Sequence, residues 1–119
     1  MLTRLQGWIR SGNDMSRFPY GNELLRNVVE NAAVPTFLAG GDGRVFYANR
    51  AFGQLLGFTP DEIVDLGIDK IVHPDDAALA REQIGSIASG KTKSYRSERR
   101  YISRSGKAVW VLVSAALLT

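Results

Sequence analysis

The sequence predicts one α+β domain in which short helices cover one face of an antiparallel sheet. Three observations indicate this class. First, two short extended segments flank the turn sequence GGDG at residues 40–43. Second, residues 49–90 contain several helix-capping residues, which indicates a run of short helices. Third, residues 93–118 return to an extended pattern. With 119 residues, 45% of them hydrophobic, the chain is long enough to bury one core.

The N-terminal part predicts two helices. Apolar residues recur at helical spacing in residues 2–10, which suggests an amphipathic helix, and residues 11–21 are rich in chain breakers and suggest a connector. A flanking helix is expected over residues 22–34, capped by Asn22 and ended before Pro35, so that the remaining core comprises residues 35–119.

Helices this short are marginal in water unless their apolar faces are covered. They could pack on their own domain, but we favour pairing with a second copy of the chain, as a homodimer with or without exchange of a helix or strand. The candidate dimer-interface residues are Leu2, Leu5, Trp8, Ile9, Leu24, Leu25, Val28 and Val29.

The middle of the chain predicts two strands and then several helices. Residues 36–39 and 44–48 are the expected hairpin strands, and residues 49–57 read as one or two helical turns. Thr59 is a good N-cap with Pro60 at the first helical position, so a helix through Leu66 is expected. After a short turn at residues 68–72, His73 precedes a longer helix that runs to about Ser89.

The last third predicts a long hairpin that turns at Ser105-Gly106. Residues 107–118 are apolar on both faces, as in a strand that has neighbours on both sides. Residues 93–104 are polar, and the segment from Lys91 to Lys107 holds seven basic residues against the single acid Glu98, although the whole chain carries only +3. We interpret this as a solvated strand; an anion-binding or nucleic-acid-binding hairpin, with Tyr95 and Tyr101 stacking on bases, is the less favoured alternative.

The composition excludes several kinds of chemistry. The chain has no cysteine, so disulfides, thiolate nucleophiles and thiol-linked chromophores are excluded. We find no apolar run of about 20 residues and no secretory signal pattern, and we expect a cytoplasmic protein without membrane contact. The carboxylates lie at predicted helix starts and exteriors, and no catalytic triad or phosphate loop is present, so neither catalytic residues nor metal ligands are expected.

Residues 49–63 (NRAFGQLLGFTPDEI), followed by HPDD at residues 73–76 and by Gly106 with Trp110-Val111, resemble a PAS domain of the sensory-box type over about residues 23–118. The resemblance implies a sensor or interaction module that passes a signal to an effector, often a histidine kinase, a cyclic-dinucleotide enzyme or a transcription regulator. It also implies five strands in the order 2-1-5-4-3. The predicted strands account for four and lack the central one. A longer chain, a partner chain or the Met15–Tyr20 segment could supply it.

The resemblance places a pocket between the sheet and the short helices, although a filled core is the alternative that we favour. Haem is disfavoured because His73, the only histidine, is expected to cap backbone amides, and the cysteine-linked flavin is excluded. Non-covalent flavin, stacked on Trp110, or another small ligand stays open. The pocket candidates are Phe37, Asn49, Phe52, Leu56, Ile63, Ile71, Ile84, Tyr95, Tyr101, Trp110 and Leu112.

The preferred functional hypothesis is a ligand or partner sensor, itself without enzymatic activity, that reports through its N-terminal helices to an effector domain in the same or a partner chain. A purely structural dimerisation domain with a filled interior is the alternative. Asn49 is expected to have a structural role, joining the second strand to the following helix.

Overall fold

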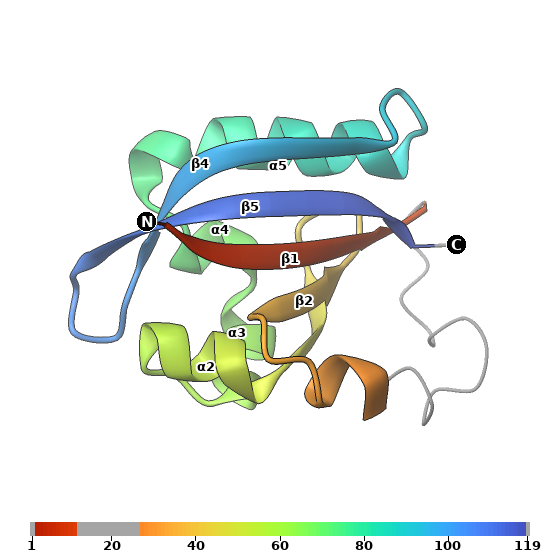
Figure 1. Ribbon diagram of the computed structural model, residues 1–119. Helices are drawn as coiled ribbons and strands as arrows, with labels where there is room; N and C mark the ends of the chain where they lie inside the picture. The colour runs from red at the N-terminus through yellow and green to blue at the C-terminus, as the bar shows by residue number, and fades with distance from the viewer. Residues whose placement is uncertain (1, 12–26, 119) are drawn as a thin grey trace.

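The computed structural model describes residues 2–11 and 27–118, which contain a five-stranded sheet with helices on one face (Figure 1). The predicted α+β class is confirmed. The spatial order of the strands is β3-β2-β1-β5-β4. The strands are β1 (Thr3–Arg10), β2 (Thr36–Ala39), β3 (Val45–Ala48), β4 (Ser94–Ile102) and β5 (Ala108–Leu118), and the helices are α2 (Arg50–Leu56), α3 (Pro60–Leu66), α4 (Ile68–Ile71) and α5 (Pro74–Ala88).

The predicted N-terminal amphipathic helix is wrong, because residues 3–10 form the strand β1. Its buried positions are Leu5, Gly7 and Ile9, and the residues between them are partly exposed. This is the two-residue period of a strand with one buried face. Of the predicted flanking helix, the described part is helical only over residues 27–30.

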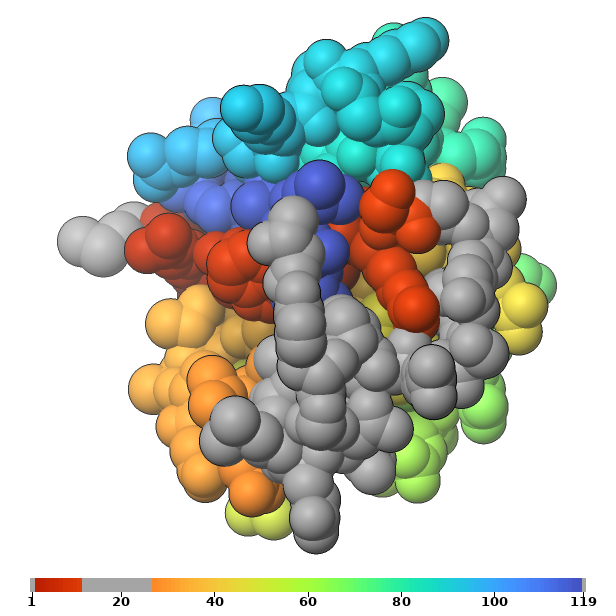
Figure 2. Space-filling view, turned by 90° about the vertical axis from the view of Figure 1, so that its right-hand side faces the viewer, coloured from red at the N-terminus to blue at the C-terminus, as the bar shows by residue number. Residues whose placement is uncertain are grey.

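β1 fills the central position of the sheet and runs parallel to both neighbours. Gln6 is paired with Thr36 on β2, and the pairing with β5 extends from Thr3 opposite Val111 to Arg10 opposite Leu118. In Figure 2 the red atoms of the N-terminal segment lie beside the blue atoms of the C-terminal strand. The prediction that the strands of this chain number only four and lack the central one is therefore wrong.

The direction of β1 makes the sheet mixed. The pairs β2–β3 and β4–β5 are antiparallel, whereas both contacts of β1 are parallel. A strand joined to β5 by a tight turn would run antiparallel to it. β1 therefore occupies the central position in the opposite direction from such a strand. The Met15–Tyr20 segment, which was one candidate to fill this position, lies outside the described residues.

The helix caps follow the sequence closely. Thr59 and Glu62 form a reciprocal capping box with Pro60 in the first turn of α3, and α2 ends at Gly57, whose φ of 80° is unfavourable for other residues. The core lies between the helices and the inner face of the sheet. At its centre the Phe52 ring is 5.9 Å from the rings of both Phe37 and Tyr101. Among the described helices, none has the length and apolar character needed to cross a membrane.

Candidate ligand-binding interior

Most of the predicted pocket residues lie together on the helix-facing side of the sheet. Tyr95 packs against this cluster at its edge and is partly exposed. Whether the cluster encloses a ligand stays a prediction, because the residues are also those of an ordinary core. The fully buried members are Phe37, Phe52, Leu56, Ile63, Ile71, Ile84 and Tyr101.

The predictions that Trp110 and Leu112 line the interior are wrong. Trp110 is 51% exposed, and the Arg100 guanidinium lies 5.2 Å from its ring centroid. Leu112 lies two residues after Trp110 on β5 and therefore on the same face of the sheet. The intervening and following residues, Val111 and Val113, are fully buried in the core on the other face. Trp110 therefore cannot be the residue on which a flavin enclosed in the interior would stack.

Asn49 is a fully buried cross-link between three segments. Its Oδ1 accepts hydrogen bonds from the backbone N–H groups of Thr36 at 2.9 Å and of Phe52 at 3.0 Å. Its Nδ2 donates to the carbonyl oxygens of Val29 and Val34, each at 3.0 Å. All these partners are backbone groups, which supports the structural role expected from the sequence.

His73 caps a helix, as predicted. Its Nδ1 accepts a hydrogen bond from the backbone N–H of Asp75 at 3.1 Å, at the start of α5. This leaves that nitrogen occupied by the backbone. The described residues contain no group of three or more histidine or acidic side chains placed to hold a metal ion.

Arg99 is the residue of the interior that the sequence interpretation missed as a site residue. It lies on β4 with 1% of its surface exposed. Its Nη2 donates to Oε1 of Gln83 on α5, and its guanidinium carbon lies 5.6 Å from the Tyr95 ring centroid. Within the part of the chain that the structure describes, its Nη1 makes no hydrogen bond, and the buried hydroxyl of Tyr95 makes none either.

The two tyrosines beside Arg99 keep their protons. Burial raises the pKa of the Tyr95 hydroxyl above its usual range, and the positive charge of Arg99 opposes this only in part. Burial likewise raises the pKa of Tyr101. Both phenols are therefore neutral at physiological pH and keep an O–H group that can donate a hydrogen bond. Because both side chains lie on the inner side of the sheet, they do not offer the surface for stacking on bases that the nucleic-acid hypothesis required.

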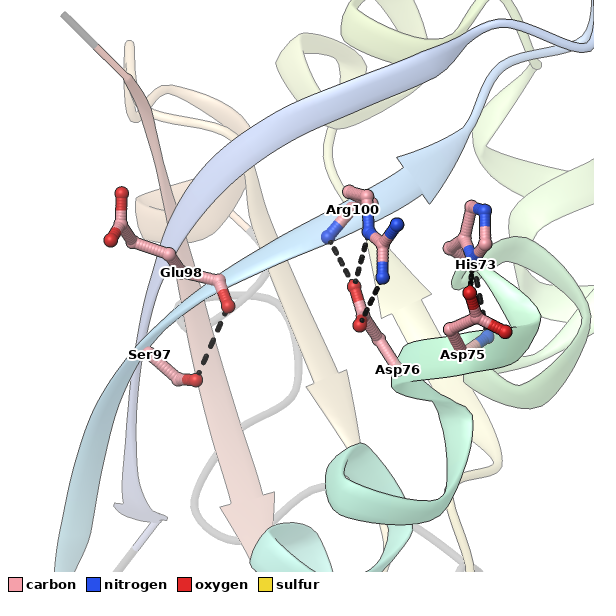
Figure 3. A network of polar contacts seen from close by, with 6 residues as sticks. All are labelled: His73, Asp75, Asp76, Ser97, Glu98 and Arg100. Atoms are coloured by element: carbon pink, nitrogen blue, oxygen red, sulfur yellow. Dashed lines mark hydrogen bonds and ion pairs between the residues drawn. The ribbon is translucent and has the colours of Figure 1, made fainter.

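Two other arginines of the basic segment are held by acids from distant parts of the chain. Arg100 donates from Nε and Nη2 to the two carboxylate oxygens of Asp76, at 3.1 and 2.9 Å, as Figure 3 shows. These bonds lower the pKa of Asp76 to about 2. Arg104 contacts Glu62 through Nη2 alone, while its Nε donates to the carbonyl oxygen of Gly57, and the contact with Arg104 is the main reason that the pKa of Glu62 is lowered to about 2. Part of the local positive charge is thus neutralised within the domain.

The predicted dimer-interface residues are divided between core and surface. Leu5 and Ile9 are fully buried in the core of a single chain, so their assignment to an interface is wrong. Val29 is also buried, whereas Val28 is 62% exposed. Leu2 and Trp8 are partly exposed, and Leu24 and Leu25 lie outside the described residues. The dimer itself stays a prediction.

The chain belongs to the PAS fold family, whose family model matches residues 45–118. Solved structures agree. A domain of a sensory box sensor histidine kinase/response regulator from Geobacter sulfurreducens has a TM-score of 0.68 and 26% identity, covering 81% of this chain and 82% of that one. A PAS domain from a two-component sensor histidine kinase has a TM-score of 0.63 and 22% identity, covering 77% and 78%, which supports the fold.

Curated relatives match this chain over a small part of their own length. The probable diguanylate cyclase DgcE of Escherichia coli (strain K12) is 31% identical over 93 residues, which are 78% of this chain and 8% of that protein. The sensor histidine kinase TmoS of Ectopseudomonas mendocina is 23% identical over 92 residues, which are 77% of this chain and 10% of that protein. This chain is thus a sensory module of PAS type, homologous to domains of larger signalling proteins.

Proposed function

We propose that this PAS domain senses a small ligand between its sheet and helices α2 to α5, and passes the signal through β1 to an effector. The observation that carries this proposal is the position of β1. Leu5 and Ile9 on its inner face belong to the core, while the strand itself is the N-terminal segment of the described chain. One element therefore contributes to the interior and is also the first described element of the chain, which is where we propose that the signal leaves the domain.

The pairing of β1 makes it sensitive to both halves of the sheet. It pairs with β2 on one side and along its whole length with β5 on the other. A ligand that prefers one arrangement of the interior changes the relative free energies of two positions of β1, and the shift is limited by that preference. The proposed signal is a change in the position of β1 relative to β2 and β5.

The relatives guide the choice of effector. Since DgcE is named a diguanylate cyclase and TmoS a sensor histidine kinase, we propose an effector of these classes, or a transcription regulator, in the same or a partner chain. The domain contributes no catalysis, acts in the cytoplasm and works as a homodimer in this proposal. Non-covalent flavin is one ligand that it allows.

The test combines native mass spectrometry with amide hydrogen exchange. The gently purified protein is examined for a retained small molecule, and exchange is then followed before and after its removal. We expect a retained mass and slower exchange in residues 3–10 when the ligand is present, with the edge strand β3 as the internal control. A bare protein, or a ligand whose removal leaves β1 unchanged, would contradict the proposed relay.

A structural dimerisation domain is the second candidate function, and it has its own supporting observation. The aromatic contacts of Phe52 with Phe37 and Tyr101 occupy the middle of the core, while Trp110 is half exposed on the outer face. This function predicts a bare dimer in native mass spectrometry. It also predicts that Trp110→Asp yields a monomer with unchanged folding, because an exposed charge is tolerated in a monomer but opposed in an apolar interface.

A further inference from the structure

Arg99 carries a buried charge that the described residues do not neutralise. Its side chain is enclosed between β4 and α5, with 1% of its surface exposed. The ion pairs of the described residues involve Arg81, Arg100, Arg104 and His73, but not Arg99. The side chains of the described residues that interact with it are neutral: Gln83 accepts a hydrogen bond from it, and its charge opposes the rise in the pKa of Tyr95 and Tyr101. A buried guanidinium without a counter-charge is costly, because desolvation opposes the charged form.

Two hydrogen-bond donors at this place are unused. Among the described residues, Arg99 Nη1 makes no hydrogen bond, and the buried hydroxyl of Tyr95 makes none either. The two groups belong to side chains in contact, since the guanidinium lies over the Tyr95 ring. Buried donors in folded proteins are nearly always satisfied by a protein group, a water or a ligand. The site therefore offers one charged and one neutral donor to something that the chain itself does not provide.

We propose that Arg99 and Tyr95 bind the carboxylate group of a small ligand, and that this carboxylate is the ligand feature recognised in the proposed sensing function, on which the inference rests. A carboxylate has two acceptor oxygens for the two free donors, and its single negative charge balances one guanidinium. A phosphate dianion would bring an extra charge and further acceptors. The remaining buried donor without a partner among the described residues, the Ser114 hydroxyl on β5, lies opposite Arg96 rather than Arg99.

The place of the site in the fold suggests a route of access. β4 is the edge strand of the sheet, and α5 runs alongside it (Figure 1). Gln83, which contacts Arg99 from α5, is itself partly exposed. The carboxylate would thus enter between α5 and β4.

Thermal unfolding with simple salts tests the anion preference. The protein, dialysed into dilute Hepes, is melted with sodium acetate, sodium phosphate or sodium chloride at matched ionic strength. Binding to the folded state alone predicts that the melting temperature rises by about 5 °C for each tenfold increase in acetate above its dissociation constant. Equal responses to all three salts, a response to phosphate alone, or no response would overturn the proposal.

Isosteric variants locate the effect. Arg99→Met removes the charge with little change in volume, and it should fold and lose the acetate response. Gln83→Glu places a carboxylate against Arg99 within the chain, and it should melt higher than the parent without acetate and respond little to it. Tyr95→Phe should weaken the response. Arg96→Met is the control, because Arg96 is an exposed residue of the same strand, and it should respond like the parent.

The outcomes separate this inference from the function on which it rests. Acetate binding that depends on Arg99, without any change of exchange in β1, would support the site and contradict the relay. A retained ligand that lacks a carboxylate and alters β1 would support the relay and overturn the carboxylate assignment. An acetate response that persists in Arg99→Met would place binding elsewhere and overturn the site.

Discussion

Gly7 on β1 faces Phe37 on β2, and the ring of Phe37 occupies the place where a side chain at position 7 would begin. The two residues are register partners, and a Cβ atom at position 7 would lie 2.6 Å from Cζ of Phe37. Phe37 is fully buried and packs against Phe52, so its ring has little room to retreat. The absence of a side chain at Gly7 is thus what allows β1 to enter the sheet here.

The first prediction follows from this contact. Gly7→Ala should lower the free energy of unfolding by about 1–3 kcal/mol, because overpacking a filled core is destabilising. This cost exceeds the gain of about 0.5–1 kcal/mol that alanine brings over glycine in a regular element. The free energy of unfolding is measured by denaturant unfolding of this variant and of the matched control Gln6→Ala, whose position lies on the partly exposed face.

A second variant tests the cause of that loss. If Phe37 is the obstacle, shortening it in the double variant Gly7→Ala with Phe37→Leu should give a smaller combined loss than the sum of the two single losses. Additive losses would show that the ring and position 7 do not meet.

Asn49 should be much more important for stability than an ordinary helix cap. Asn49→Ala leaves the buried N–H groups of Thr36 and Phe52 and the carbonyls of Val29 and Val34 without this partner. We expect a loss of about 2–4 kcal/mol in urea unfolding, since each unsatisfied buried group costs about 1–3 kcal/mol. The exposed cap variant Thr59→Ala should lose only about 1 kcal/mol, and similar losses in both would argue against the cross-link.

The Asp76–Arg100 pair should make stability depend on pH in the acid range. The pKa of Asp76 is lowered from 3.8 to about 2 in the folded protein, so the folded state favours the ionised form. The resulting stabilisation is present above pH 4 and is lost as the pH falls towards 2. At pH 7 we expect Asp76→Asn to be less stable than the parent by about 1–2 kcal/mol, and the difference should shrink between pH 4 and pH 2.

The neighbouring acid provides the control for this pH dependence. Asp75 also lies in the first turn of α5, but its side chain is 75% exposed. Asp75→Asn should therefore change stability little across the same range. If the parent and Asp76→Asn differ equally at pH 2 and pH 7, the contact with Arg100 is not the source of the effect.

The elements with local signals could be predicted from the sequence, and those defined by distant partners could not. The caps at Thr59 and His73 depend on neighbouring residues and were correct. β1 was mistaken for a helix because Leu5, Trp8 and Ile9 fit helical spacing. Its true alternation includes Gly7 as a buried position, and only the ring of Phe37, brought there by β2, explains that glycine.

Two errors in the interior have a related origin. β5 is apolar at nearly every position, so the sequence did not reveal which residues face the helices, and Trp110 and Leu112 were chosen in place of Val111 and Val113. Arg99 did carry a signal, because alternation placed it on the same face as Tyr95 and Tyr101. It was overlooked since arginine is rarely buried without a partner.

A designed disulfide tests most directly whether the chain's own N-terminal strand completes the sheet. The protein has no cysteine, so Gln6→Cys with Ser114→Cys, which are register partners on β1 and β5, introduces a single possible pair. After oxidation we expect an intrachain disulfide and a monomer on a non-reducing gel, while Gln6→Cys with Glu98→Cys, where Glu98 lies on β4 beyond β5, should stay reduced. A covalent dimer, or no disulfide in the register pair, would contradict the account.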